Sequence, residues 1–160
     1  MSIRTVRLSI AIPVFNEAAT VQPLVHAVQE ALHGLTVEII LVDDGSFDGT
    51  TQLIRVVDDS GIRVFFHAKN QGKGAALRTA FKHATGDIVV TQDADMEYDP
   101  KDILTLVHPI LDGHADVVFG SRFHGRAQRI HLYWHRVANR WLTWLTNVLF
   151  NLDLSDMETG

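Results

Sequence analysis

Short runs rich in valine and isoleucine alternate with segments of helical periodicity along most of the chain. Five runs are almost continuously apolar, as strands buried on both faces are, and they are "RLSIAIPVF", "VEIILVDD", "IRVFFH", "DIVVTQ" and "ADVVFGS". Helices are expected between and after them, over residues 20–33, 48–58, 75–84, 100–112 and 133–150. The alternation predicts an α/β fold with a mostly parallel sheet, right-handed crossovers and flanking helices.

The composition limits the class of protein. The chain has 160 residues, 46 % of them apolar and 21 % charged, which suits one folded domain with its own core. It has no cysteine, which excludes disulfides, thiolate metal sites and a cysteine nucleophile. The formal net charge of −5 argues against nucleic acid as a partner. No apolar run reaches about eighteen residues, so no membrane span is expected.

Charged and glycine-rich clusters follow the expected strands. They are "PVFNE", "DDGS", "HAKNQGKG", "QDADME" and "GSRFHG". The carboxyl ends of parallel strands meet at one edge of an open α/β sheet, and ligands bind in the crevice there. The sequence therefore predicts one ligand site built from these loops.

Acidic residues occupy every second position in "TQDADMEYDP", at Asp93, Asp95, Glu97 and Asp99. In an extended chain alternate side chains point the same way, so the first three acids would repel one another unless a cation lay between them. Carboxylate oxygens suit Mg²⁺ or Mn²⁺, and the pattern predicts a divalent metal site at Asp93 and Asp95. The alternative is a solvated loop whose acids cap a helix, a role that suits Asp99 before Pro100.

Three further patterns have competing interpretations. Asp44, at the end of "VEIILVDD", could accept hydrogen bonds from a base or a ribose, or it could serve turn chemistry before Gly45. "NQGKGAA" lacks the ending of a Walker phosphate loop and the third glycine of GxGxxG, so it is expected to allow close helix–strand packing beside a ligand pocket. An EF-hand is excluded, because Tyr98 and Leu104 stand where that loop needs glycine and glutamate.

The segment after the last expected strand is basic and rich in tryptophan. Its arginines are Arg122, Arg126, Arg129, Arg136 and Arg140. This cluster suits a diphosphate or an anionic membrane surface, or it is a solvated basic loop. Trp134, Trp141 and Trp144 are typical of a membrane interface and equally of a core. His131 and His135 have the helical spacing of a shared metal site, but no third ligand is obvious.

Together these motifs resemble an inverting family 2 glycosyltransferase of GT-A fold, the Rossmann-like fold of nucleotide-diphospho-sugar transferases. The segments that carry the resemblance are "IAIPVFNEAATV", "EIILVDDGSFDGT", "NQGKGAALRTAF", "GDIVVTQDADMEYDP" and "VVFGSR". Within the family the chain is most similar to dolichyl-phosphate mannose synthases and other polyprenyl-phosphate glycosyltransferases. Residues 1–160 are expected to form a single catalytic domain, truncated at its C-terminus because "DMETG" breaks off inside a motif that relatives continue.

The resemblance implies how a nucleotide-sugar is held. Pro13, Phe15 and Glu17 match the first loop of the family, where the nucleoside lies. Val42 and Asp44 match the segment that contacts the base and the ribose.

The resemblance also implies the catalytic and metal-binding positions. Asp93, Ala94 and Asp95 match the DxD motif, which carries the metal and the sugar diphosphate. Glu97 stands where relatives often have another polar ligand, which makes it a third expected metal ligand. Arg122 matches an arginine that faces the donor.

The implied reaction moves a sugar from a nucleotide-sugar donor to an acceptor, with inversion at the anomeric carbon and Mg²⁺ or Mn²⁺ as cofactor. A divalent ion would stabilise the departing nucleoside diphosphate as a Lewis acid. The similar branch implies a lipid-phosphate acceptor, which is already anionic and needs no strong general base. A sugar hydroxyl acceptor, as in polysaccharide synthesis, would need a base, and Asp156 is the candidate.

Two other functional classes stay open. One is a non-catalytic nucleotide-binding module, and the other is a dinucleotide-dependent oxidoreductase, which is disfavoured because no GxGxxG follows the first strand. A transferase of this branch is expected to work in cell-envelope glycan biosynthesis on the cytoplasmic side of a membrane. It would reach the membrane surface through residues 131–150 or through a missing C-terminal segment.

Overall fold

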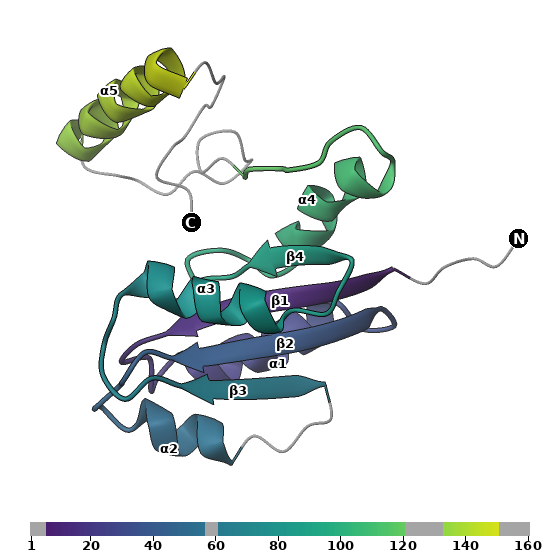
Figure 1. Cartoon of the computed structure of the whole chain (residues 1–160), viewed down its shortest axis with the longest axis vertical. Helices are drawn as coiled ribbons and strands as arrows, with labels where there is room; N and C mark the ends of the chain where they lie inside the picture. The colour runs from purple at the N-terminus through teal and green to yellow at the C-terminus, as the bar shows by residue number, and fades with distance from the viewer. Residues whose placement is uncertain (1–5, 57–60, 121–132, 151–160) are drawn as a thin grey trace, which may run out of the picture. The chain divides into compact units, whose positions relative to one another are not determined.

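The computed structural model describes residues 6–56, 61–120 and 133–150 (Figure 1). The strands are β1 (Arg7–Val14), β2 (Thr36–Asp43), β3 (Ile62–Phe66) and β4 (Ile88–Thr91). The helices are α1 (Val21–Ala31), α2 (Thr50–Arg55), α3 (Lys73–His83), α4 (Asp102–Leu111) and α5 (Tyr133–Phe150).

The four strands are parallel and lie in the order β3-β2-β1-β4. Ile10 of β1 is aligned with Ile39 of β2 on one side and with Val90 of β4 on the other. The direction of strand addition therefore reverses after β3, because β4 joins the far side of β1. Such a reversal opens a crevice at the carboxyl ends of the strands that flank it, here β1 and β4.

Two apolar layers hold the sheet between helices. On one face, β1 and β2 pack against α1, α2 and α4, and the buried cluster is Leu8, Ile10, Ile12, Val14, Val21, Leu24, Val25, Val28, Leu32, Ile39, Leu41, Ile54, Ala94, Ile103 and Val107. On the other face, Ala11, Ile40 and Val42 pack against Ala76 and Ala80 of α3. Figure 1 shows α3 in front of the sheet and α1 behind it. The alanines let α3 approach the strands closely, as expected from "NQGKGAA".

A buried acid joins the strands at the amino-terminal edge of the sheet. Glu38 of β2 is 1 % exposed and accepts hydrogen bonds from the Ser9 hydroxyl at 2.6 Å and from the Thr85 amide at 2.6 Å. Arg7 and Arg63 approach the same carboxylate at 3.5 and 3.4 Å. Burial by itself raises the pKa of Glu38, but the hydrogen bonds from Ser9 and Thr85 and the charge of Arg7 outweigh it and lower the pKa to about 2.

The prediction of a fifth strand at "ADVVFGS" is wrong. Residues 117–120, part of "ADVVFGS", carry no strand pairing in the described chain, and Val117 and Phe119 are 66 and 64 % exposed. A run of β-prone residues becomes a strand only where a neighbouring edge and register receive it, and composition alone does not supply these. The helix expected over 75–84 begins earlier, at Lys73, and the helix expected over 48–58 is described only as Thr50–Arg55.

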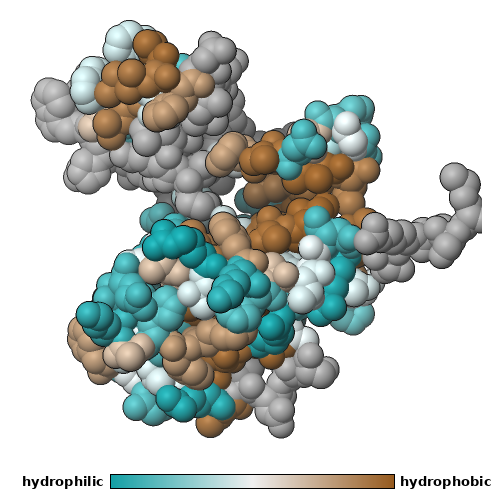
Figure 2. Space-filling model, viewed as in Figure 1, coloured by the Kyte–Doolittle hydropathy of each residue, from teal (hydrophilic) through white to brown (hydrophobic). Residues whose placement is uncertain are grey.

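The chain separates into two compact units, residues 1–107 and 108–160. The first unit contains the sheet and α1–α3, and the second contains α5. On α5 five apolar side chains are between 60 and 69 % exposed, and they are Trp141, Trp144, Val148, Leu149 and Phe150. Figure 2 shows apolar residues gathered on this helix.

No helix in the described ranges combines the length and the hydrophobicity that crossing a bilayer requires.

Candidate functional site

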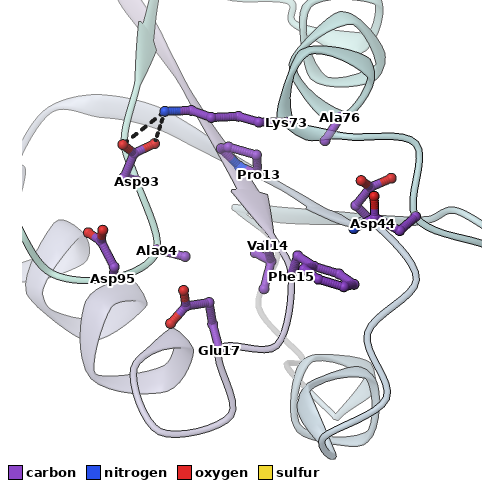
Figure 3. A pocket seen from close by; sticks show the side chains of 11 residues that line it. Pro13, Val14, Phe15, Glu17, Asp44, Lys73, Ala76, Asp93, Ala94 and Asp95 are labelled. Carbon is purple, nitrogen blue, oxygen red and sulfur yellow. Dashed lines mark hydrogen bonds and ion pairs between the residues drawn. The ribbon is translucent and has the colours of Figure 1, made fainter. Parts of the chain in front are cut away.

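A cavity of about 380 Å³ opens at the carboxyl edge of the sheet (Figure 3). Its walls come from the ends of β1 and β2, the segment that leads into α3, α3 itself and the loop after β4. The lining residues are Pro13, Val14, Phe15, Glu17, Asp44, Asn70, Lys73, Ala76, Asp93, Ala94 and Asp95. The cavity therefore lies where the strand order reverses, and it is made from four of the five charged or glycine-rich clusters of the sequence.

The loops after β1 and β2 are tied to each other by hydrogen bonds. The Asn16 side chain accepts a bond from the Phe47 amide at 3.0 Å, and Asn16 itself has a left-handed φ of 57°. The Thr50 hydroxyl accepts a bond from the Glu17 amide at 2.9 Å and donates to Asp48. The bond from the Thr50 hydroxyl lowers the pKa of Asp48. These contacts fix the backbone of the loop that forms one wall of the cavity.

An aromatic ring forms part of that wall. Phe15 meets Phe47 edge-on, with ring centroids 5.9 Å apart and an interplanar angle of 77°. Figure 3 shows the Phe15 ring between Glu17 and Asp44. A partly exposed ring held in this way offers an apolar surface on which a planar base can lie.

Asp44 borders the cavity but is almost fully buried, at 2 % exposure. Its Oδ1 lies 2.6 Å from Nδ1 of His67, and its Oδ2 accepts bonds from the amides of Gln71 at 3.0 Å and Gly72 at 2.7 Å. His67 is held in turn by Thr79 of α3, 2.9 Å from Nε2. Asp44 therefore orders the loop that leads into α3. Its expected contact with a nucleoside stays a prediction.

Lys73, the first residue of α3, reaches to Asp93 in the loop after β4 (Figure 3). Its Nζ lies 2.7 Å from Oδ1 and 2.9 Å from Oδ2 of Asp93. The Lys73 side chain is 48 % exposed and that of Asp93 is 20 % exposed. A protein cation thus neutralises the first acid of the "DAD" segment.

The acidic segment is not extended, contrary to expectation. Residues 94–95 form a turn, and Met96 has a left-handed φ of 60°. The Glu97 amide donates to Oδ1 of Asp95 at 2.8 Å, and the buried Gln92 side chain holds the turn by donating to the Tyr98 carbonyl at 3.2 Å. Because the chain turns here, Asp93 and Asp95 line the cavity and Glu97 is not among its lining residues.

The described part of the chain contains no group of three His, Asp or Glu side chains placed to hold a metal ion together. Asp93 and Asp95 still present carboxylate oxygens to one cavity, and such oxygens suit Mg²⁺ or Mn²⁺. These ions often keep few protein ligands and complete their coordination with substrate phosphates and water. The residues therefore fit a metal that binds with a diphosphate, and the expected role of Glu97 as a third ligand stays a prediction.

The other expected site residues divide into two groups. Val42 is fully buried and packs in the layer beneath α3, outside the cavity lining. Arg122 and Asp156 lie outside the described residues, so the donor contact of the one and the base role of the other stay predictions.

Sequence reasoning did not single out Lys73 or Asn70 as site residues. Both lie in "KNQGKG", which the pattern of strand ends had already located at the ligand edge of the sheet. The signal that could have found Lys73 is its positive charge, the only charge in "NQGKGAA". That segment and the acidic segment at Asp93 and Asp95 are both expected at the same edge of the sheet, where a cation would reduce the repulsion between the acids.

Comparisons with known proteins agree that the relatives of this chain are glycosyltransferases. The sequence model of "Glycosyl transferase family 2" matches residues 9–157. An undecaprenyl-phosphate 4-deoxy-4-formamido-L-arabinose transferase of Aeromonas hydrophila is 40 % identical over 116 residues, which are 69 % of this chain and 35 % of that protein. A dolichol-phosphate mannosyltransferase of Pyrococcus furiosus is 34 % identical over 118 residues, 73 % of this chain and 33 % of that protein. The chain thus spans about a third of the length of these curated relatives.

Solved structures agree on the fold. A mannosyltransferase from Pyrobaculum calidifontis, in complex with GDP-Man and Mn²⁺, matches with a TM-score of 0.55 and 30 % identity over 64 % of this chain and 31 % of that one. A glucosyl-3-phosphoglycerate synthase from Mycobacterium tuberculosis, solved with Mn²⁺, UDP and glucosyl-3-phosphoglycerate, matches with a TM-score of 0.55 and 32 % identity over 66 % of this chain and 40 % of that one. The expected GT-A fold is confirmed.

Proposed function

Because the chain belongs to glycosyl transferase family 2, we propose that its cavity binds a nucleotide-sugar and that the protein transfers the sugar to an acceptor. The observation that carries this proposal is the meeting of Phe15 and Asp44 with Asp93 and Asp95 around one cavity. Phe15 offers a surface for the base, and the two acids after β4 lie where a metal-bound diphosphate can be held.

The proposed cofactor is Mg²⁺ or Mn²⁺, held by Asp93 and Asp95. Two neighbours of this chain were solved with Mn²⁺, one with GDP-Man and one with UDP, and they support this choice. When bound, such an ion stabilises the negative charge that develops on the departing nucleoside diphosphate. The loop that contains Phe15 and Glu17 is fixed by hydrogen bonds, so it can orient the nucleoside without reorganising.

We propose a polyprenyl phosphate as the acceptor and inversion at the anomeric carbon as the outcome. The relatives from Aeromonas and Pyrococcus are named for undecaprenyl phosphate and dolichol phosphate, which supports the acceptor class. A phosphate acceptor is already an anion, so the described site needs no strong general base for this reaction. The alternative is a sugar hydroxyl acceptor, which would require a base such as Asp156.

A lipid acceptor implies a position at a membrane surface, which we propose to be peripheral and on the cytoplasmic side. The exposed Trp141 and Trp144 of α5, with Arg140 beside them, suit the interface of an anionic bilayer. The 160-residue chain is expected to bind vesicles rich in anionic lipid. Replacing Trp141 and Trp144 with alanine is expected to weaken this binding. Equal binding by the two proteins would contradict this position.

The test of the proposed function is calorimetry of UDP, GDP and dTDP with the 160-residue chain, in Mn²⁺ and in EDTA. One nucleotide is expected to bind at least about tenfold more tightly in Mn²⁺, and Asp95→Asn is expected to remove that gain while leaving the thermal melting temperature nearly unchanged. A transfer assay with radiolabelled nucleotide-sugar and polyprenyl phosphate then tests the acceptor. Equal nucleotide affinity in Mn²⁺ and EDTA would overturn the metal assignment, and binding without any turnover by a longer natural chain would favour a non-catalytic module.

A further inference from the structure

The proposed function does not use Lys73, although its ammonium contacts both oxygens of the Asp93 carboxylate, at 2.7 and 2.9 Å. The two residues come from different elements, the start of α3 and the loop after β4, and both line the cavity. Figure 3 shows the lysine side chain extended from α3 to reach the acid.

A lysine and a divalent ion need the same oxygens of Asp93. An ammonium 2.7 Å from a carboxylate oxygen occupies the space that a metal ion would take, and it would repel a dication placed beside it. A metal that takes both oxygens of Asp93 therefore displaces Lys73 from them. Because Lys73 is about half exposed, the ion pair is weak enough to be broken.

We propose that Lys73 is a built-in counter-cation, which competes with the metal for Asp93 and thereby couples metal binding to diphosphate binding. This inference rests on the proposed function, since it needs Asp93 to be a metal ligand. Without a nucleotide, the displaced ammonium loses its only described ion-pair partner. With a diphosphate in the cavity, the ammonium gains a new anion within reach.

Coupling between two ligands is reciprocal, so the same factor by which nucleotide tightens metal binding also describes how metal tightens nucleotide binding. Removal of the lysine charge should affect metal binding without nucleotide and metal binding with nucleotide differently. Metal binding alone should become tighter, because the competitor is gone. The increase in metal affinity that nucleotide causes should become smaller, because no lysine ammonium is left to move from Asp93 to the diphosphate.

The test compares Mn²⁺ affinity with and without the nucleoside diphosphate that binds best, measured by calorimetry and by the electron paramagnetic resonance signal of free Mn²⁺. The variant is Lys73→Met, which removes the charge and keeps a long side chain with good helix propensity. Lys73→Arg keeps the charge. The matched control is Lys82→Met, an exposed lysine nine residues further along α3 and about 13 Å away along its axis.

Lys73→Met is expected to bind Mn²⁺ alone about two- to tenfold more tightly than the native chain, and to show a coupling factor lower by a similar amount. Lys73→Arg and Lys82→Met are expected to stay within about twofold of native. Unchanged or weaker Mn²⁺ binding by Lys73→Met, or an equal gain in Lys82→Met, would overturn the inference while the proposed function stands. Absence of Mn²⁺ and nucleotide binding in the native chain and in every variant would overturn both.

Discussion

Glu38 carries a charge in the interior of the first unit, at the sheet edge away from the cavity. Its folded pKa of about 2 lies below the ordinary value of 4.5, so its hydrogen bonds stabilise the folded chain fully above pH 4.5. That contribution is lost as the pH falls from 4.5 toward 2. The shift corresponds to about 3 kcal/mol of folding free energy.

Glu38→Gln is therefore expected to lower the free energy of unfolding at pH 7 by about 2–3 kcal/mol, with the difference from native shrinking below pH 4.5. Urea denaturation between pH 3 and pH 7 measures both curves. Glu30→Gln, at an exposed position on α1, is the control and should change stability by less than about 0.5 kcal/mol. Parallel curves for native and Glu38→Gln would show that this carboxylate does not govern acid stability.

Asp44 is a second buried acid whose structural role comes from the hydrogen bonds that its carboxylate accepts. Asp44→Ala removes both carboxylate oxygens, so the Gln71 and Gly72 amides lose their acceptor and His67 loses its partner. The expected loss is about 1–3 kcal/mol of stability, with faster hydrogen exchange at those two amides. Unchanged exchange at Gln71 and Gly72, measured by NMR, would mean that Asp44 does not order this loop.

The nucleoside contact of Asp44 is tested in the absence of metal. Asp44→Ala is expected to weaken nucleoside monophosphate binding in EDTA, because a carboxylate at the cavity wall is lost and the loop behind it is released. Calorimetry compares the variant with the native chain. An unchanged affinity would leave Asp44 with a structural role alone.

At the scale of elements, the loops after β1 and β2 act as one unit through Thr50. Thr50→Val keeps the shape of the side chain but removes the hydroxyl that accepts from the Glu17 amide and donates to Asp48. A loss of about 1–3 kcal/mol is expected, and the pKa of Asp48 should rise, which NMR titration measures. Thr50→Ser keeps the hydroxyl and should preserve the low pKa of Asp48. A low Asp48 pKa in Thr50→Val would contradict the link.

Elements with a strong local signal were predictable from the sequence. β1 and β2 are almost continuously apolar, with Ser9 and Glu38 among the buried polar exceptions. The helix α1 follows the helical period with Val21, Leu24, Val25 and Val28 buried. "ADVVFGS" has the same local signal but carries no strand pairing over residues 117–120, since pairing depends on a partner edge that local sequence does not describe.

The candidate site was predictable to a similar extent. The strand-end rule located Phe15, Asp44, Asp93 and Asp95 at one edge, and the structure places them around one cavity. The contact between Lys73 and Asp93 joins residues that are 20 positions apart and belong to different elements. This contact depends on how α3 packs against the sheet, and the hydrophobic periodicity of the sequence does not predict that packing angle. The turn at Met96, which separates Glu97 from the cavity, was likewise hidden by the regular spacing of the acids.

At the scale of the whole molecule, the chain covers only part of the length of its curated relatives. The chain corresponds to about a third of the relatives named for polyprenyl phosphates, and within that third lie the sheet, the cavity and the acids of the proposed metal site. Nucleotide with Mn²⁺ at 100 times its dissociation constant is expected to stabilise the first unit by about 2.7 kcal/mol. A thermal melt that does not move under these conditions would show that the cavity does not bind the pair.

The reversal of strand order also sets when a newly made chain acquires its site. β4 pairs with β1 across 80 positions, Leu8 beside Ile88, whereas β1, β2 and β3 are complete by Phe66. A nascent chain that has emerged from the ribosome only through β3 holds Phe15 and Asp44 but neither Asp93 nor Asp95. It can form a wall for a base and has no carboxylates from the loop after β4 for a metal. The proposed metal site is therefore complete only after β4 has been made and has docked beside β1, the first strand in the chain.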